Sequence, residues 1–146
     1  MSDCYALLGL INHAVNELEA ARDLEPQDGF YHFRLGDLYA RSGRLHDGIA
    51  EMQQAAIFSP YDGYYNVRLG TLYLQAGYTL EAAEAFRQAV DLEPQNPSYH
   101  CLLGDAYVRL GYERQALKHY RCAGRLDAYD CAYVDRVRSF AALGAA

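Results

Sequence analysis

Apolar residues recur along this chain with the three-to-four-residue spacing of amphipathic helices. In segment 30–41 one helical face carries Tyr31, Leu35, Leu38 and Tyr39, and in segment 45–58 another carries Leu45, Ile49, Met52 and Ala56. Gly43 interrupts the pattern between the two segments, and Pro60 ends the second one, because proline cannot continue a helix. The pattern predicts a helix hairpin, whose members we call helix A and helix B.

The same residue types return every 34 positions. The series are Tyr5, Tyr39, Tyr73 and Tyr107; Gly9, Gly43, Gly77 and Gly111; Gly36, Gly70 and Gly104, each after a leucine; Ala21, Ala55, Ala89 and Ala123; and Pro26, Pro60 and Pro94. Several series with one period predict a supersecondary unit stacked on copies of itself, which is an all-α solenoid. The small residues at Gly36 and Gly48 are expected to let helix A and helix B approach closely.

The period divides the chain into units within a single domain, 1–146. Complete units are expected at 29–62, 63–96 and 97–130, with a capping helix at 131–146. A truncated unit is expected at 1–28, in which 1–9 supplies about two turns of helix A and 11–24 supplies a full helix B.

These residues resemble the tetratricopeptide repeat, a 34-residue unit with the pattern L-G-x-x-Y, then G, A, F, A and P. The second complete unit matches it with Leu69, Gly70, Tyr73, Gly77, Ala82, Phe86, Ala89 and Pro94. The chain departs from the family pattern at the fourth position of each unit, where a bulky residue is common and this chain has His32, Asn66 and His100. The resemblance implies a right-handed superhelix whose A helices line a concave groove, and non-catalytic recognition of a partner's peptide or helix.

Composition narrows the function class. The net charge of −6 and the single lysine, Lys118, disfavour nucleic-acid binding, which needs a basic field. No apolar stretch reaches the length of a membrane span, and no secretory signal stands at the start, so we expect a cytoplasmic protein, with secretion or surface exposure left open. The cysteines Cys4, Cys101, Cys122 and Cys131 form no CxxC pair and are expected as thiols, with a Cys122–Cys131 disulfide as the alternative.

If helix A faces the groove as the resemblance implies, its second, fifth, ninth, twelfth and thirteenth positions form the partner-binding surface. The candidate site residues are Phe30, Phe33, Asp37, Arg41, Tyr64, Val67, Thr71, Leu74, Gln75, Cys101, Asp105, Val108 and Arg109. Six of them, Phe30, Phe33, Tyr64, Val67, Leu74 and Val108, would form an apolar patch that marks an interaction site. The alternative is that the phenylalanines pack between helices and break the patch.

The charged candidates have two interpretations. Asp37 and Arg41, like Asp105 and Arg109, stand four residues apart and form ordinary surface pairs on a helix. Alternatively, Arg41 and Arg109 grip a partner's carboxylates. Family members that bind chaperone C-termini have lysine, arginine or asparagine at the positions of Phe33, Asp37, Cys101 and Asp105, so the sequence does not favour this clamp.

Catalysis and cofactors find little support in the sequence. His32 and His100 lie two units apart, and a set of His119, Cys122 and Asp127 has only the common spacing of helix neighbours. We therefore expect no enzyme activity, no cofactor and no metal.

Self-assembly is the main rival to partner binding. A solenoid exposes two unlike ends, and complementary ends propagate into rings or filaments. In the truncated unit we expect Val15 and Leu18 to be less covered than Ile49, Met52 and Phe86, and at the other end we expect Phe140 or Leu143 to be exposed.

Overall fold

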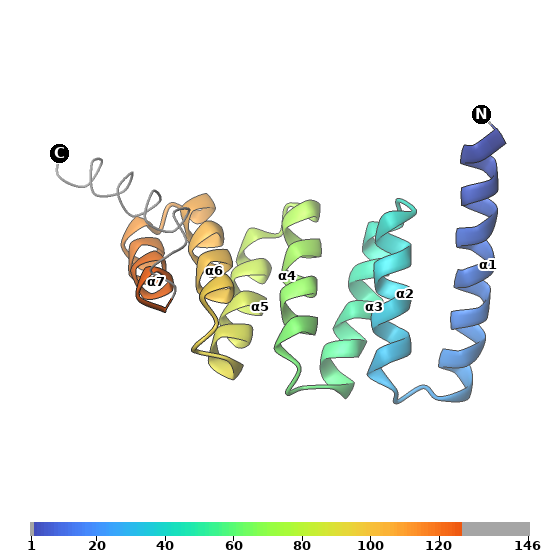
Figure 1. Cartoon of the computed structure of the whole chain (residues 1–146), viewed down its shortest axis with the longest axis horizontal. Helices are drawn as coiled ribbons and strands as arrows, with labels where there is room; N and C mark the ends of the chain where they lie inside the picture. The colour runs from blue at the N-terminus through green and yellow to red at the C-terminus, as the bar shows by residue number, and fades with distance from the viewer. Residues whose placement is uncertain (1, 127–146) are drawn as a thin grey trace.

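In the computed structural model, residues 2–126 are described. They form seven helices and no strand. The helices are α1 Ser2–Leu24, α2 Gly29–Arg41, α3 Leu45–Phe58, α4 Gly63–Ala76, α5 Thr79–Leu92, α6 Pro97–Leu110 and α7 Glu113–Leu126. Each helix packs on the next along the chain, so that the hairpins α2–α3, α4–α5 and α6–α7 stack in a row (Figure 1). The predicted all-α solenoid is confirmed. The expected capping helix, with Phe140 and Leu143, lies outside the described residues.

The recurring residues set the ends of the helices. Asp28, Asp62 and Asn96 each accept a hydrogen bond from the backbone N–H two residues later, which caps the start of helix A. The glycines that follow helix A adopt the left-handed conformation that other residues avoid, with φ of 88° at Gly43, 86° at Gly77 and 81° at Gly111. Every 34 residues the sequence therefore repeats a capping residue at the start of helix A and a turn glycine after its end.

The truncated first unit differs from its prediction. Residues 2–24 form one continuous helix, α1, and Gly9 lies within it without the positive φ of the three matching glycines. The expected break between helix A and helix B is therefore wrong. A glycine permits a turn but does not impose one. The helix hydrogen bonds therefore continue through Gly9, where no other described helix stabilises a turn. As a result, the first turns of α1 project beyond the end of α2 (Figure 1).

The glycines on helix A allow close approach to helix B. A Cβ atom at Gly36 would lie 2.9 Å from the carbonyl oxygen of Gly48, and one at Gly48 would lie 2.8 Å from that of Gly36. In the next two units a ring takes this space, because a Cβ at Gly70 or Gly104 would lie 2.6 Å from a ring atom of Phe86 or Tyr120. The expected close contact of the two helices is confirmed.

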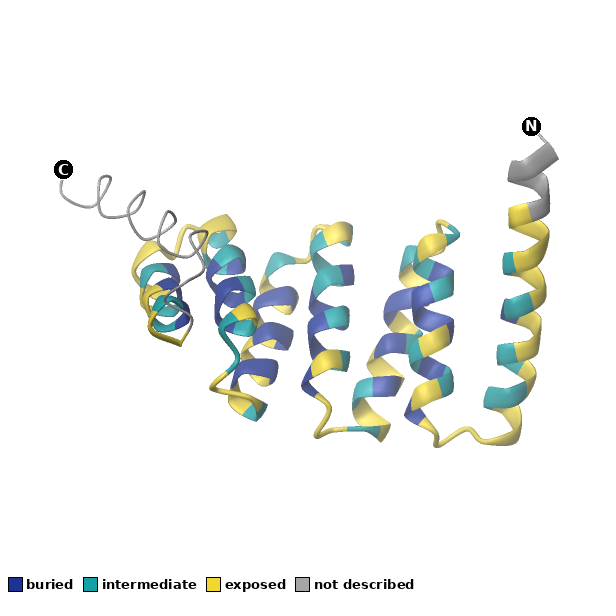
Figure 2. Cartoon of the chain, in the orientation of Figure 1, coloured by how far each residue is buried: buried dark blue, intermediate teal, exposed yellow. Residues whose placement is uncertain are grey.

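The expectation that Val15 and Leu18 are less covered than Ile49, Met52 and Phe86 is confirmed for Leu18, while Val15 differs little from Ile49. Val15 is 7 % exposed, as well covered as Ile49 at 6 %, because it packs against Leu35 and Tyr39 of α2. Leu18 is only half-buried. From Leu7 onward, the side of α1 that faces away from α2 is exposed (Figure 2). Among the described residues, no helix is both long and apolar enough to cross a membrane.

Candidate functional site

An aromatic cluster joins the beginnings of α2 and α4. Phe33 stacks on Tyr65 with ring centres 4.7 Å apart and contacts Tyr64 at 5.6 Å. Phe30 lies one helical turn before Phe33 on the same face of α2. Phe30 is 52 % exposed and Tyr64 is 48 % exposed, whereas Phe33 is half-buried between the two helices. The cluster therefore presents two solvent-facing rings on a rigid base.

A charged cluster follows one turn further along the same helices. Asp37 is 7 % exposed and accepts a hydrogen bond of 2.5 Å from Arg68 of α4. Arg41 Nε lies 3.2 Å from the other carboxylate oxygen of Asp37, and the Arg41 side chain is 69 % exposed. Asp37 and Arg41 thus form the expected pair, but the pair belongs to a link between two units and includes Arg68, which the sequence reasoning missed.

The candidate residues divide by exposure. Solvent-facing members are Phe30, Arg41, Tyr64, Gln75, Val108 and Arg109; half-buried members are Phe33, Thr71, Leu74 and Asp105; buried members are Asp37, Val67 and Cys101. Val67 packs in the core around Phe86, and Asp105 accepts a hydrogen bond from Tyr120. The six apolar candidates do not all reach the surface, since Phe33 packs between helices and Val67 is in the core. The binding role of the set stays a prediction.

Two buried histidines form links that the sequence analysis did not foresee. His32 Nε2 donates to the carbonyl oxygen of Pro26 at 2.8 Å, and its Nδ1 lies 2.7 Å from the carboxylate of Glu51, which also binds Arg22 at 2.7 Å. His100 Nε2 donates in the same way to Pro94 at 2.8 Å, and its Nδ1 lies 3.1 Å from Nδ1 of His119. The sequence feature common to both links is a histidine followed 19 residues later by a polar partner on helix B, Glu51 after His32 and His119 after His100.

The His100–His119 pair fixes a tautomer. Because Nε2 of a neutral His100 carries the proton that Pro94 accepts, its Nδ1 is an acceptor, and Nδ1–H of His119 donates to it. Burial, the nearby His100 and then Lys118 lower the pKa of His119 from 6.5 to about 4. Among the residues that the structure describes, no group of three or more histidine, cysteine or acidic side chains is placed to hold a metal ion. Asp127 and Cys131, and with Cys131 the alternative disulfide, lie outside this part of the chain.

The depressed pKa of His119 predicts a pH-dependent stability. Between about pH 6.5 and 4 the unfolded chain binds the proton more readily than the folded chain, so the free energy of unfolding falls as the pH drops through this window. His119→Gln keeps an N–H donor for His100 but does not titrate, so its stability should fall less over the same window. Urea denaturation of both proteins at pH 7, 6, 5 and 4 checks this, and equal slopes would contradict it.

Comparison with known proteins agrees with this geometry. One family model, described as "TPR repeat", matches residues 70–111, and a second, described as "Tetratricopeptide repeat", matches residues 8–63. No curated protein matches the chain in sequence.

Solved structures share the fold at low identity. A crystal structure of MamA superposes with a TM-score of 0.81 at 16 % identity, covering 96 % of this chain and 82 % of that one. The first TPR domain of Spaghetti (RPAP3), bound to the HSP90 peptide SRMEEVD, has a TM-score of 0.73 at 18 % identity, covering 82 % and 95 %. A thermophilic TPR protein of Thermus thermophilus, TTC0263, has a TM-score of 0.68 at 22 % identity, covering 92 % and 75 %. Taken with the repeat period and the helix hairpins, these matches show that the chain belongs to the tetratricopeptide repeat family.

Proposed function

We propose that this protein-interaction scaffold binds a short segment of a partner protein on the groove-facing side of its A helices, at the aromatic cluster of Phe30, Phe33 and Tyr64. The observation that carries the proposal is the exposure of Phe30 and Tyr64, 52 % and 48 %, around a ring held in place by Tyr65. Exposed rings on a rigid base give a partner large contact area at little cost in side-chain entropy.

The chemistry of this surface favours an apolar anchor over an acidic peptide. The RPAP3 domain holds the acidic peptide SRMEEVD. In this chain Asp37 already binds two arginines, and Asp105 accepts a hydrogen bond from Tyr120. The middle of the surface therefore carries carboxylates, which do not attract an acidic peptide. The partner segment should place an aromatic or aliphatic side chain against Phe30 and Tyr64. At the far end of α2, the exposed guanidinium of Arg41 is positioned to meet a carboxylate of the same segment.

Peptides selected from a random library on the immobilised chain test the site. Replacing both Phe30 and Tyr64 with serine should weaken a selected peptide at least about tenfold from a roughly micromolar Kd, measured by calorimetry, because the anchor loses its rings. Phe33 and Leu74 are less suitable positions, since Phe33 packs against two rings and Leu74 packs on the core.

Tyr61→Ser is the matched control, because Tyr61 is 88 % exposed and lies in the turn between α3 and α4. It should leave the affinity unchanged. If the double serine variant bound the selected peptides as tightly as the original chain, the aromatic cluster would not be the binding site.

Self-association through α1 is a second candidate function. Leu7, Leu8 and Leu10, in the first half of α1, are 59 %, 50 % and 67 % exposed. Leu7 and Leu10, which are three residues apart and share one face of α1, form an apolar surface that a second copy can cover.

Light scattering after size exclusion checks the self-association. We expect the mass to rise with protein concentration and to resist roughly 0.5 M salt, since the contact is apolar. Leu7→Arg with Leu10→Arg should abolish the rise, whereas Leu80→Arg, on α5 at a leucine that is 62 % exposed, should not. A constant monomer mass would remove this candidate and leave partner binding intact.

A further inference from the structure

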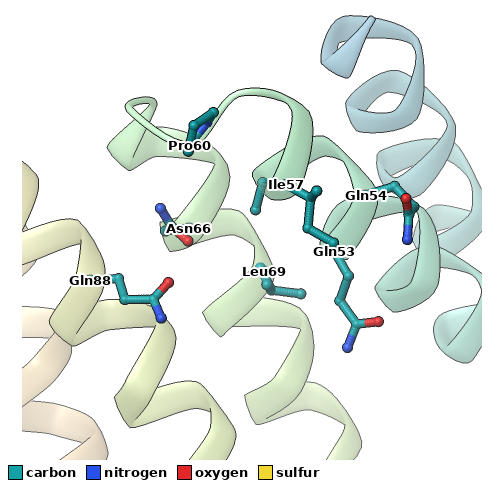
Figure 3. A pocket seen from close by; sticks show the side chains of 8 residues that line it. Gln53, Gln54, Ile57, Pro60, Asn66, Leu69 and Gln88 are labelled. Carbon is teal, nitrogen blue, oxygen red and sulfur yellow. The ribbon is translucent and has the colours of Figure 1, made fainter. Parts of the chain in front are cut away.

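A pocket of about 360 Å³ opens at the junction of α3, α4 and α5 (Figure 3). It is lined by Gln53, Gln54, Ala56, Ile57, Pro60, Asn66, Leu69 and Gln88, none of which is charged. The pocket residues of α4, Asn66 and Leu69, lie on the opposite side of that helix from Tyr64 and Thr71, because each residue advances an α-helix by about 100°. The pocket is therefore separate from the aromatic cluster.

The repeat period shows what occupies this place in the other units. Pro60 and Asn66 correspond to Pro26 and His32 in the first complete unit and to Pro94 and His100 in the third. At both of those places the imidazole is buried and donates Nε2–H to the proline carbonyl at 2.8 Å. A residue of helix B holds the other ring nitrogen, Glu51 at 2.7 Å in one unit and His119 at 3.1 Å in the other.

The middle unit lacks both halves of this link. Ala85 stands where the other units have Glu51 and His119, and its side chain ends at Cβ. Asn66 is only 4 % exposed, yet its sole hydrogen bond is a long one of 3.5 Å from Nδ2 to the carbonyl oxygen of Asp62. Within residues 2–126, nothing donates to the Pro60 carbonyl or to Oδ1 of Asn66. The Oδ1 atom of Asn66 and the carbonyl oxygen of Pro60, both on residues that line the pocket, are therefore available to a donor from outside the chain.

We propose that this pocket receives the imidazole ring of a histidine side chain from a partner protein. The ring takes the place that His32 and His100 occupy in their own units and donates an N–H to the carbonyl oxygen of Pro60 or to Oδ1 of Asn66. The pocket is larger than one ring, so it also admits the backbone next to the histidine. The carboxamides of Gln54 and Gln88 also line the pocket, and each offers the donor and acceptor that a peptide bond requires, whereas Nε2 of Gln53 donates to the hydroxyl of Tyr73. With no charged side chain in the lining, the neutral ring is the form that fits.

The probe for this site is the capped tripeptide acetyl-Gly-His-Gly-amide, titrated at pH 8 into the ¹⁵N-labelled chain and followed by NMR. Side-chain amide signals of Asn66 and Gln88 should shift with a roughly millimolar Kd. The alanine counterpart should bind at least about tenfold more weakly. Imidazole alone should shift Asn66 but bind more weakly than the histidine peptide, because it cannot reach the glutamines. Equal shifts from the histidine and alanine peptides, or equal affinity for imidazole and peptide, would overturn the proposal.

Asn66→His tests the same idea from inside the chain, since it supplies the ring that the neighbouring units carry. It should reduce binding of the histidine peptide at least about tenfold, while Gln75→His, on the exposed opposite side of α4, should leave the affinity unchanged. Gln88→Ala, at an exposed rim position, does not depend on repacking the interior and should weaken the peptide several-fold without changing the affinity for imidazole. Unchanged peptide binding by Gln88→Ala, or by a folded Asn66→His, would show that the pocket is not the site. Neither result bears on the aromatic cluster.

Discussion

Replacing Gly70 with leucine is expected to lower the free energy of unfolding by about 3 kcal/mol or more, at the upper end of what inserted core volume costs. A Cβ atom at this position would lie 2.6, 2.8 and 2.9 Å from three ring atoms of Phe86. Phe86 is 0 % exposed, so its ring has no free space into which it can move. The helices α4 and α5 would have to separate, and the unit would lose its central contact.

Urea denaturation measures this effect against a control on the same helix. Gln75 is exposed on α4, and Gln75→Ala should change the free energy of unfolding by less than about 0.5 kcal/mol. Similar denaturation midpoints for the two variants would show that Gly70 does not sit against α5.

Phe86→Ala is expected to cost about 3–5 kcal/mol, because it removes the largest side chain of the central core and leaves a cavity. Phe86 lies in one cluster with Val67, Leu103 and Ala106, and therefore connects three successive helices, α4, α5 and α6. Its loss should loosen the junction between two units as well as the hairpin to which it belongs. The same urea denaturation, followed by circular dichroism, gives the change.

The two substitutions should also interact. Leucine at position 70 clashes with the ring that Phe86→Ala removes, so the double variant should be more stable than the sum of the two separate losses predicts. Gly104→Leu combined with Phe86→Ala gives the matched control, since Gly104 faces Tyr120 instead. Equal coupling in both pairs would mean that the steric contact between Gly70 and Phe86 is not the cause.

The placement of the candidate residues shows where sequence reasoning ended. The helix pattern correctly placed Phe33 and Asp37 on one side of α2, because that side depends only on spacing along the helix. It did not predict that Phe33 packs between Tyr64 and Tyr65 or that Asp37 binds Arg68, since both contacts cross from one unit to the next. Contacts between units depend on how the hairpins are rotated against each other, and no periodicity within one helix reports that rotation.

The sequence alone determined the features that depend on residues close together in the chain, namely the helix caps and the turns. The capping residues Asp28, Asp62 and Asn96 and the turn glycines act on backbone groups a few residues away, so the repeat period sufficed to give the complete hairpins and their stacking. Only the tertiary structure decided the features that depend on a neighbouring helix. Gly9 shares the register of the turn glycines yet lies within a continuous helix, because no neighbouring helix stabilises a turn there. Asn66 shares the register of His32 and His100 yet borders a pocket and forms no link to helix B, because Ala85 stands where the other two units have Glu51 and His119.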